Sequence, residues 1–132
     1  MSKSFTAALT LTSTTLFPQN STVSANLTQV VSGSAGFDIL VVSQSSTQNL
    51  YTSVAADNSS TVYFYAQALS TNPQTLLLSI TGSNTSGSSI VRLRPGDMTY
   101  LPLNVDAAGV AVNCVNASTS SANIYTFYGQ RS

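Results

Sequence analysis

Short runs in which apolar and polar residues alternate one by one constrain this chain more than any other feature. Between residues 5 and 12, Phe5, Leu9 and Leu11 occupy odd positions, and threonine fills three of the four even ones. Successive side chains of a strand point to opposite faces, so this period of two predicts a strand with one buried face. Comparable runs recur along the chain between turn-forming residues, which predicts an antiparallel sheet protein.

The composition favours strands over both helices and disorder. Charged residues make up 6% of the 132 residues, Glu is absent and Lys occurs once, whereas Ser and Thr number 23 and 17. Good helix formers are therefore scarce. A hydrophobic content of 42% argues against a disordered chain. We expect an all-β protein.

Ten short segments have strand character, with turn signals between them. They are residues 5–12, 23–31, 37–42, 50–55, 61–69, 75–80, 90–94, 98–103, 110–115 and 123–128. The dense apolar run at 37–42 predicts a central strand covered on both faces. Residues 33–36, with two glycines, predict a break, and the polar stretch 81–89 predicts a loop. Pro95-Gly96 fits a type II turn, and Pro102 predicts an edge strand.

About eight to ten short strands at this spacing are typical of an antiparallel β-sandwich. We expect a single domain over residues 1–132. A jelly roll, with two four-stranded sheets, is the favoured form. An immunoglobulin-like sandwich is the alternative, although no Cys…Trp…Cys spacing is present.

The absence of several residue types excludes whole classes of chemistry. Without His or Glu the usual general bases are missing, and one Cys with no His cannot make a four-ligand zinc site. We predict no catalytic residue, no metal and no cofactor. Cys114 is expected to be a small buried side chain. Four scattered basic residues predict no nucleic-acid partner, and no apolar run of membrane-spanning length predicts no membrane partner.

Two arginines stand out because the chain has so few charges. Arg92 and Arg94 are two residues apart on a predicted strand, so their side chains share a face. Such a pair could bind carboxylates across a subunit interface, because bidentate Arg–carboxylate pairing is strong. Alternatively, they lie on a solvated edge, with Asp97 as a local turn residue. Asp38 is either their partner or a residue near solvent at the start of its strand, and the second interpretation is preferred.

Tyr63 and Tyr65 alternate with Val62, Phe64 and Ala66 in the strongest predicted strand. If the even set forms the core, the tyrosines face outward and provide a surface for contact with another chain. Packing between sheets is the equal alternative. The nearly uncharged surface as a whole suits a protein that spends its life assembled.

The C-terminal third resembles small β-sandwich virion proteins of tailed bacteriophages, of the capsid decoration (cement) or fibre and knob type. The likeness rests on the segments Arg92–Asp97, Tyr100–Leu103, Val110–Val112 and Ile124–Gly129. It implies a non-enzymatic structural role, often as a trimer seated on the major capsid protein. Because the first residues do not form the apolar segment of a signal peptide, we expect synthesis in the host cytoplasm and a place on the virion surface.

Two other functions stay open at this point. A receptor- or glycan-binding fibre or knob domain would bind glycans as an isolated protein. A self-assembling coat or filament subunit would form particles on its own, although packaged nucleic acid calls for more positive charge than this chain carries.

Overall fold

The computed structural model describes residues 3–13, 21–54, 60–82, 85–105 and 109–131, and every regular element within these ranges is a strand. The strands are β1 (Lys3–Ser13), β2 (Ser21–Val42), β3 (Ser46–Thr52), β4 (Ser60–Ala68), β5 (Leu76–Gly82), β6 (Thr85–Leu93), β7 (Met98–Val105), β8 (Ala111–Asn116) and β9 (Ala122–Arg131). The prediction of an all-β chain is confirmed.

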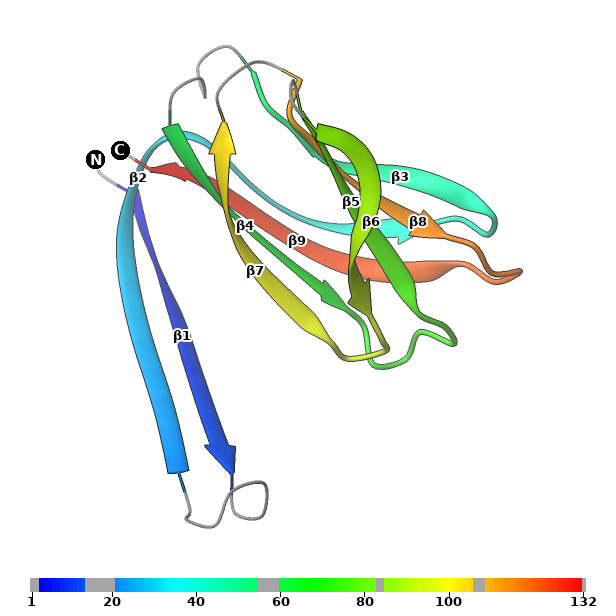
Figure 1. Cartoon of the computed structure of the whole chain (residues 1–132), viewed down its shortest axis with the longest axis horizontal. Coiled ribbons are helices and arrows are strands. Elements are labelled where there is room, and N and C mark those ends of the chain that lie inside the picture. The colour runs from blue at the N-terminus through cyan, green and yellow to red at the C-terminus, as the bar shows by residue number, and fades with distance from the viewer. Residues whose placement is uncertain (1–2, 14–20, 55–59, 83–84, 106–108, 132) are drawn as a thin grey trace.

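The strands form two antiparallel sheets that pack as a β-sandwich (Figure 1). Sheet A has the order β1-β2-β9-β4-β7, and sheet B has the order β3-β8-β5-β6. The pairings are nested along the sequence: β5 pairs with β6, β4 with β7, β3 with β8 and β2 with β9. Only β1 stands outside this nest, as the hairpin partner of β2.

The core lies between the two sheets and follows the alternation of each strand. In β4, the side chains of Val62, Phe64 and Ala66 are buried, which confirms the even set as the core face. Sheet B contributes the buried side chains of Leu76, Leu78, Leu93, Val112 and Cys114. Burying these apolar groups is the main favourable term in folding.

A buried asparagine joins the end of β8 to β2. The Nδ2 group of Asn116 donates hydrogen bonds to the carbonyl oxygens of Val42 (3.0 Å) and Ser120 (2.8 Å). Its Oδ1 accepts from the backbone N–H of Ser118 at 3.1 Å and from the Gln74 amide at 3.3 Å. Because buried polar groups must be paired, this side chain fixes the β8–β9 loop against both sheets.

The connection from β6 to β7 has the predicted turn. Gly96 has a φ of +89°, and the Asp97 N–H donates to the carbonyl of Arg94 at 2.9 Å. A positive φ at the third turn residue is the requirement of a type II turn. The following strand, β7, contains Pro102 and lies at the edge of sheet A, as expected.

The predicted loop at 81–89 is wrong. The structure extends β5 to Gly82 and begins β6 at Thr85, and residues 83 and 84 lie outside the described ranges. Polar residues such as Thr are compatible with strand positions, so a polar composition did not separate a loop from a hairpin here.

The predicted break at 33–36 is also wrong, because β2 continues through it as one strand of 22 residues. The pairing with β9 is irregular between Val31 and Ala35, so a bulge rather than a loop accommodates this segment. At Gly36 a side chain is excluded: a Cβ atom there would lie 2.5 Å from Cε1 of Tyr128. The glycine therefore makes room for an aromatic ring inside the ladder.

The N-terminal hairpin projects from the sandwich (Figure 1). All of β1 pairs with β2, from Lys3 opposite Val31 to Ser13 opposite Ser21, whereas β9 begins to pair with β2 only at Val31. We call β1 together with residues 21–31 of β2 the arm. A two-stranded ribbon alone is at best marginally stable in water, so what covers the arm matters for function.

Candidate functional site

The outer face of sheet A, which points away from the core, gathers aromatic side chains. Tyr63 and Tyr65 belong to this face, opposite the core set of β4, but Tyr63 is only 6% exposed and Tyr65 is half-buried. Tyr63 stacks on Tyr100 of β7 with ring centroids 6.0 Å apart, and Tyr65 donates its hydroxyl hydrogen to the Gln67 side chain at 2.9 Å. Burial raises the pKa of Tyr65, and it raises the pKa of Tyr100 with a further contribution from Tyr63.

The same face is open to solvent over β2. Phe37, Ile39 and Val41 are 70%, 51% and 56% exposed, whereas their neighbour Val42 is fully buried. The prediction that residues 37–42 are covered on both faces is therefore wrong. Sheet B covers one face, and within the described residues nothing covers the other.

The arm carries a second exposed apolar face. Leu9 lies opposite Ala25 and Leu11 lies opposite Val23, so these side chains share one side of the hairpin. Leu9, Leu11, Val23 and Leu27 are 52%, 58%, 63% and 37% exposed. The other side of the hairpin is mostly Thr, Ser and Asn. The arm has the pattern of a strand pair with one buried face, yet that face is uncovered.

Phe5 connects the two surfaces. Its ring lies 5.6 Å from that of Tyr63 and 5.1 Å from that of Phe127, both edge-on. Phe5 belongs to the apolar side of the arm, and Tyr63 and Phe127 belong to the outer face of sheet A. The apolar side of the arm and the outer face of sheet A therefore form one continuous surface, which we call the open face.

The open face is poor in charge where it is described. Its alternating positions in β2, β4 and β9 hold mostly apolar and neutral polar residues, and a charged residue, Arg131, lies at the end of β9. Interface centres are depleted in charged residues and enriched in aromatic ones. The open face has this composition.

Arg92 lies on the opposite side of the sandwich, and Arg94 lies in the turn that connects the two sheets. Arg92 is exposed on the outer face of sheet B, opposite Leu77, and Arg94 is exposed just after β6. Asp97 does not neutralise them: its Oδ2 accepts the backbone N–H of Arg94 at 3.0 Å, as a turn residue does. Among the described side chains, no ion pair reaches either guanidinium group.

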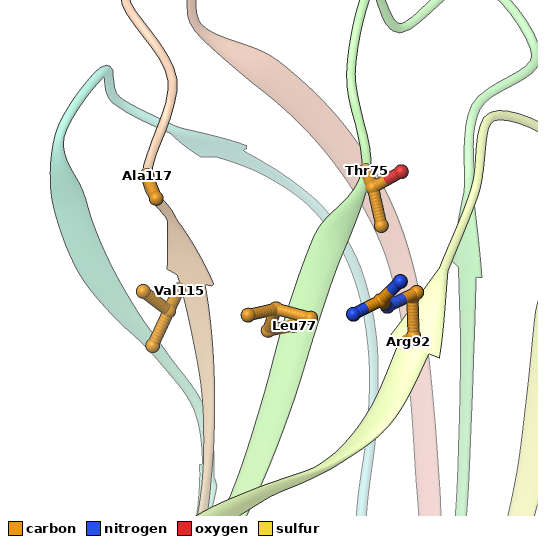
Figure 2. Close-up of a pocket in the computed structure, with 5 residues that line it drawn as sticks. All are labelled: Thr75, Leu77, Arg92, Val115 and Ala117. Carbon is orange, nitrogen blue, oxygen red and sulfur yellow. The ribbon is translucent and has the colours of Figure 1, made fainter.

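Arg92 also borders a shallow depression of about 200 Å³ on sheet B. Figure 2 shows its guanidinium extending from β6 toward Leu77, below Thr75, with Val115 and Ala117 on the far side. The volume is below the roughly 300–1,000 Å³ of typical small-molecule sites. The depression is a shallow surface feature rather than a ligand pocket.

The remaining predicted interface residue stands apart from the arginines. Asp38 is exposed on β2 of sheet A, and its Oδ1 accepts the backbone N–H of Ile39 at 2.7 Å. No ion pair joins it to Arg92 or Arg94 within the described ranges. The six predicted residues are therefore not one cluster. Tyr63 and Tyr65 belong to the open face, Arg92 lies on the outer face of sheet B, Arg94 and Asp97 lie in the turn after β6, and Asp38 stands apart.

Cys114 is a buried core side chain, and desolvation raises the pKa of its thiol to about 12. Such a thiol is protonated at neutral pH and is a poor nucleophile. In the described part of the chain, no three His, Cys, Asp or Glu side chains group as metal ligands would. Nor does that part contain a helix able to span a membrane.

Comparisons with known proteins give no relative. No protein-family model matches the chain, no curated protein matches it, and no solved structure matches it.

Sequence reasoning missed the largest part of the open face. It selected Tyr63 and Tyr65 but took the apolar residues of 5–12 and 37–42 for core. The sequence did contain a signal for this face. A sandwich of two four-stranded sheets needs eight strands, and the alternating segments 5–12 and 23–31 bring the predicted total to ten, so two amphipathic strands are left over.

Proposed function

We propose that this protein is a non-enzymatic virion structural protein, a bacteriophage capsid decoration or cement protein that binds and stabilises the assembled head. The observation that carries the proposal is the open face, a broad and mostly apolar surface on an otherwise well-packed sandwich. Contiguous patches of this kind mark protein interaction sites.

The strand order supports a jelly roll as the finer description of the sandwich. Counted from β2, the eight strands pair first with last, second with seventh, third with sixth and fourth with fifth. A jelly roll has this nested pairing, because it forms when one long hairpin rolls up into two sheets. Jelly rolls recur in viral capsid and lectin domains. A fold alone does not determine a function, so the choice between a decoration, a fibre and a coat protein depends on the surfaces of the molecule.

Arg92 and Arg94 are suited to contact the shell. Arg92 lies across the sandwich from the open face and Arg94 lies in the turn after β6, so a shell contact at Arg92 leaves the open face free. Their guanidinium groups have no carboxylate partner among the described side chains, and a capsid protein could supply one. Removing an arginine from a buried ion pair costs about 2–5 kcal/mol of binding free energy.

The test combines imaging with a pelleting assay. The chain is expressed alone and together with the genes that neighbour its own, and particles are examined by negative-stain microscopy. We expect particles only in the co-expression, with the chain pelleting on them. Shells or filaments from the chain alone would instead indicate a coat or filament subunit, and glycan binding without particle binding would indicate a fibre or knob domain.

The double variant Arg92→Ala, Arg94→Ala tests the shell contact. We expect it to fold as the wild type does, since exposed substitutions change stability by less than about 0.5 kcal/mol, and to lose co-pelleting with particles. Thr99→Ala, a half-buried polar position on β7 of sheet A, serves as a control. Unchanged pelleting of the double variant would leave the arginines as ordinary surface charges.

A further inference from the structure

The open face is large for the exposed apolar surface of a monomer. The exposed apolar side chains on it are Leu9, Leu11, Val23, Leu27, Phe37, Ile39 and Val41. Their exposed fractions correspond to roughly 650 Å², approaching the share that each partner contributes to a stable protein interface and at the upper limit of the largest patch of a typical monomer. An apolar area close to one side of a standard interface is therefore left uncovered in the single chain.

In this structure the arm covers only a small part of this surface within its own molecule. It continues sheet A through β2, and its apolar side and the outer face of sheet A belong to the same side of that continuous strand. Only the base of the arm, at Phe5, reaches Tyr63 and Phe127. The part with the most exposed leucine and valine, Leu9 to Leu11 opposite Val23 to Ala25, lies farther out along the hairpin (Figure 1).

One chain carries two matching halves of an interface. The arm presents an aliphatic ridge on a narrow ribbon, and the outer face of sheet A presents a broad surface with aromatic rings. Neither half contains an unpaired acidic group among the described side chains, so bringing them together desolvates no carboxylate. A partner of another sequence would have to supply a matching apolar surface, whereas a second copy already has one.

We propose that the arm of one copy packs its apolar side on the outer face of sheet A of another copy. The residues that carry this contact are Leu9 and Leu11 on the arm and Phe37, Ile39 and Val41 on the sheet. Exchanging arms between copies buries both halves of the open face in every subunit, and it gives each hairpin the packing that an isolated ribbon lacks. The inference stands on these contacts alone and does not depend on a virion role.

Paired variants on the two sides of one strand test the contact. Leu9→Asp with Leu11→Asp places two charges on the apolar side of the arm, and Thr10→Asp with Thr12→Asp places the same two charges on its polar side. We expect the wild type to be oligomeric in sedimentation at about 100 µM. The leucine pair should weaken association about 100-fold or more, because two buried leucines are lost. The threonine pair should leave association within about threefold.

Crosslinking identifies the surfaces directly and does not rely on loss of assembly. Two proteins are prepared with Cys114→Ala, so that each has a single cysteine. One carries Leu11→Cys, and the other carries Ile39→Cys and a different affinity tag. After mixing, a short bismaleimide should join the two tags, whereas Thr12→Cys in place of Leu11→Cys should not. A monomeric wild type, equal effects of the two aspartate pairs, or equal crosslinking from Leu11→Cys and Thr12→Cys would each overturn the proposal. Particle pelleting is scored separately, so failure of the virion role leaves this result readable.

Discussion

The arm and the sandwich use the same sequence pattern and reach different outcomes. In β4, alternation places Val62, Phe64 and Ala66 against sheet B, and all three are buried. In β1, the same alternation places Leu9 and Leu11 on one side of a ribbon, and both stay more than half exposed. The difference is not in the strands but in what faces them. Alternation of apolar and polar residues predicts that one face of a strand is suited to burial. It does not predict whether the same chain or another chain covers that face.

The largest contrast is expected between a core residue and an arm residue of similar apolar character. Phe64→Ala should lower the free energy of unfolding by about 3–5 kcal/mol, since the side chain is fully buried. Leu11→Ala should change it by less than about 0.5 kcal/mol at concentrations where the chain is monomeric. Urea denaturation of both variants measures this. Comparable losses at the two positions would mean that the arm is packed within its own molecule.

A variant of Asn116 tests how much buried hydrogen bonds stabilise the sandwich, a contribution that the arm lacks. Asn116→Ala removes the donors to Val42 and Ser120 and the acceptor for Ser118. Leaving these buried groups unpaired should cost about 2–3 kcal/mol. Thermal unfolding monitored by circular dichroism measures the loss, with Asn104→Ala, at an exposed position of β7, as the control. A loss equal to that of the control would show that water replaces the side chain.

Gly36 lies where β2 passes from the arm into the sandwich. Gly36→Ala should destabilise the protein by about 1–3 kcal/mol, because the new methyl group would meet the Tyr128 ring. A double-mutant cycle with Tyr128→Leu sharpens the test. The cost of Gly36→Ala should fall when the ring is absent, and a cost that is independent of Tyr128 would point to the backbone instead.

The pH dependence of stability reports on the core through Cys114. Its thiol has a pKa of about 12 in the folded protein and 9.0 when free. Between these values the unfolded chain loses a proton that the folded chain keeps, so stability should fall as pH rises, by about 1.4 kcal/mol per pH unit. The raised pKa values of Tyr65 and Tyr100 act in the same direction. Denaturation between pH 8 and 10 should give a shallower slope for Cys114→Ala than for the wild type, and equal slopes would contradict a buried thiol.

Local chemistry made most of the sandwich predictable. The Pro95-Gly96 turn, the edge position of the strand with Pro102, and the inward set of β4 each follow from backbone geometry or alternation. The continuity of β2 through Gly33 and Gly36 does not, because a glycine in a bulge and a glycine in a turn have the same sequence signal. Only the ring of Tyr128, which is 92 residues later in the numbering, explains Gly36.

The surface that we propose as an interface was predictable in kind but not in place. Sequence reasoning selected Tyr63 and Tyr65 and inferred an assembled protein from the lack of charge. It treated residues 37–42 as doubly covered, since an apolar strand covered by a second sheet and one awaiting another subunit have the same composition. Deciding between them required the sheet order, which leaves Phe37, Ile39 and Val41 outside the sandwich.

Amide hydrogen exchange at two chain concentrations tests most directly the claim that the arm is completed by another copy. Peptides from β4 and β9 should be protected equally at low and high concentration, because the sandwich packs within one chain. Peptides from β1 and from residues 21–31 should exchange quickly when dilute and become protected as concentration rises. Arm peptides that exchange at the same rate at both concentrations, while sedimentation shows the oligomer forming, would contradict the account.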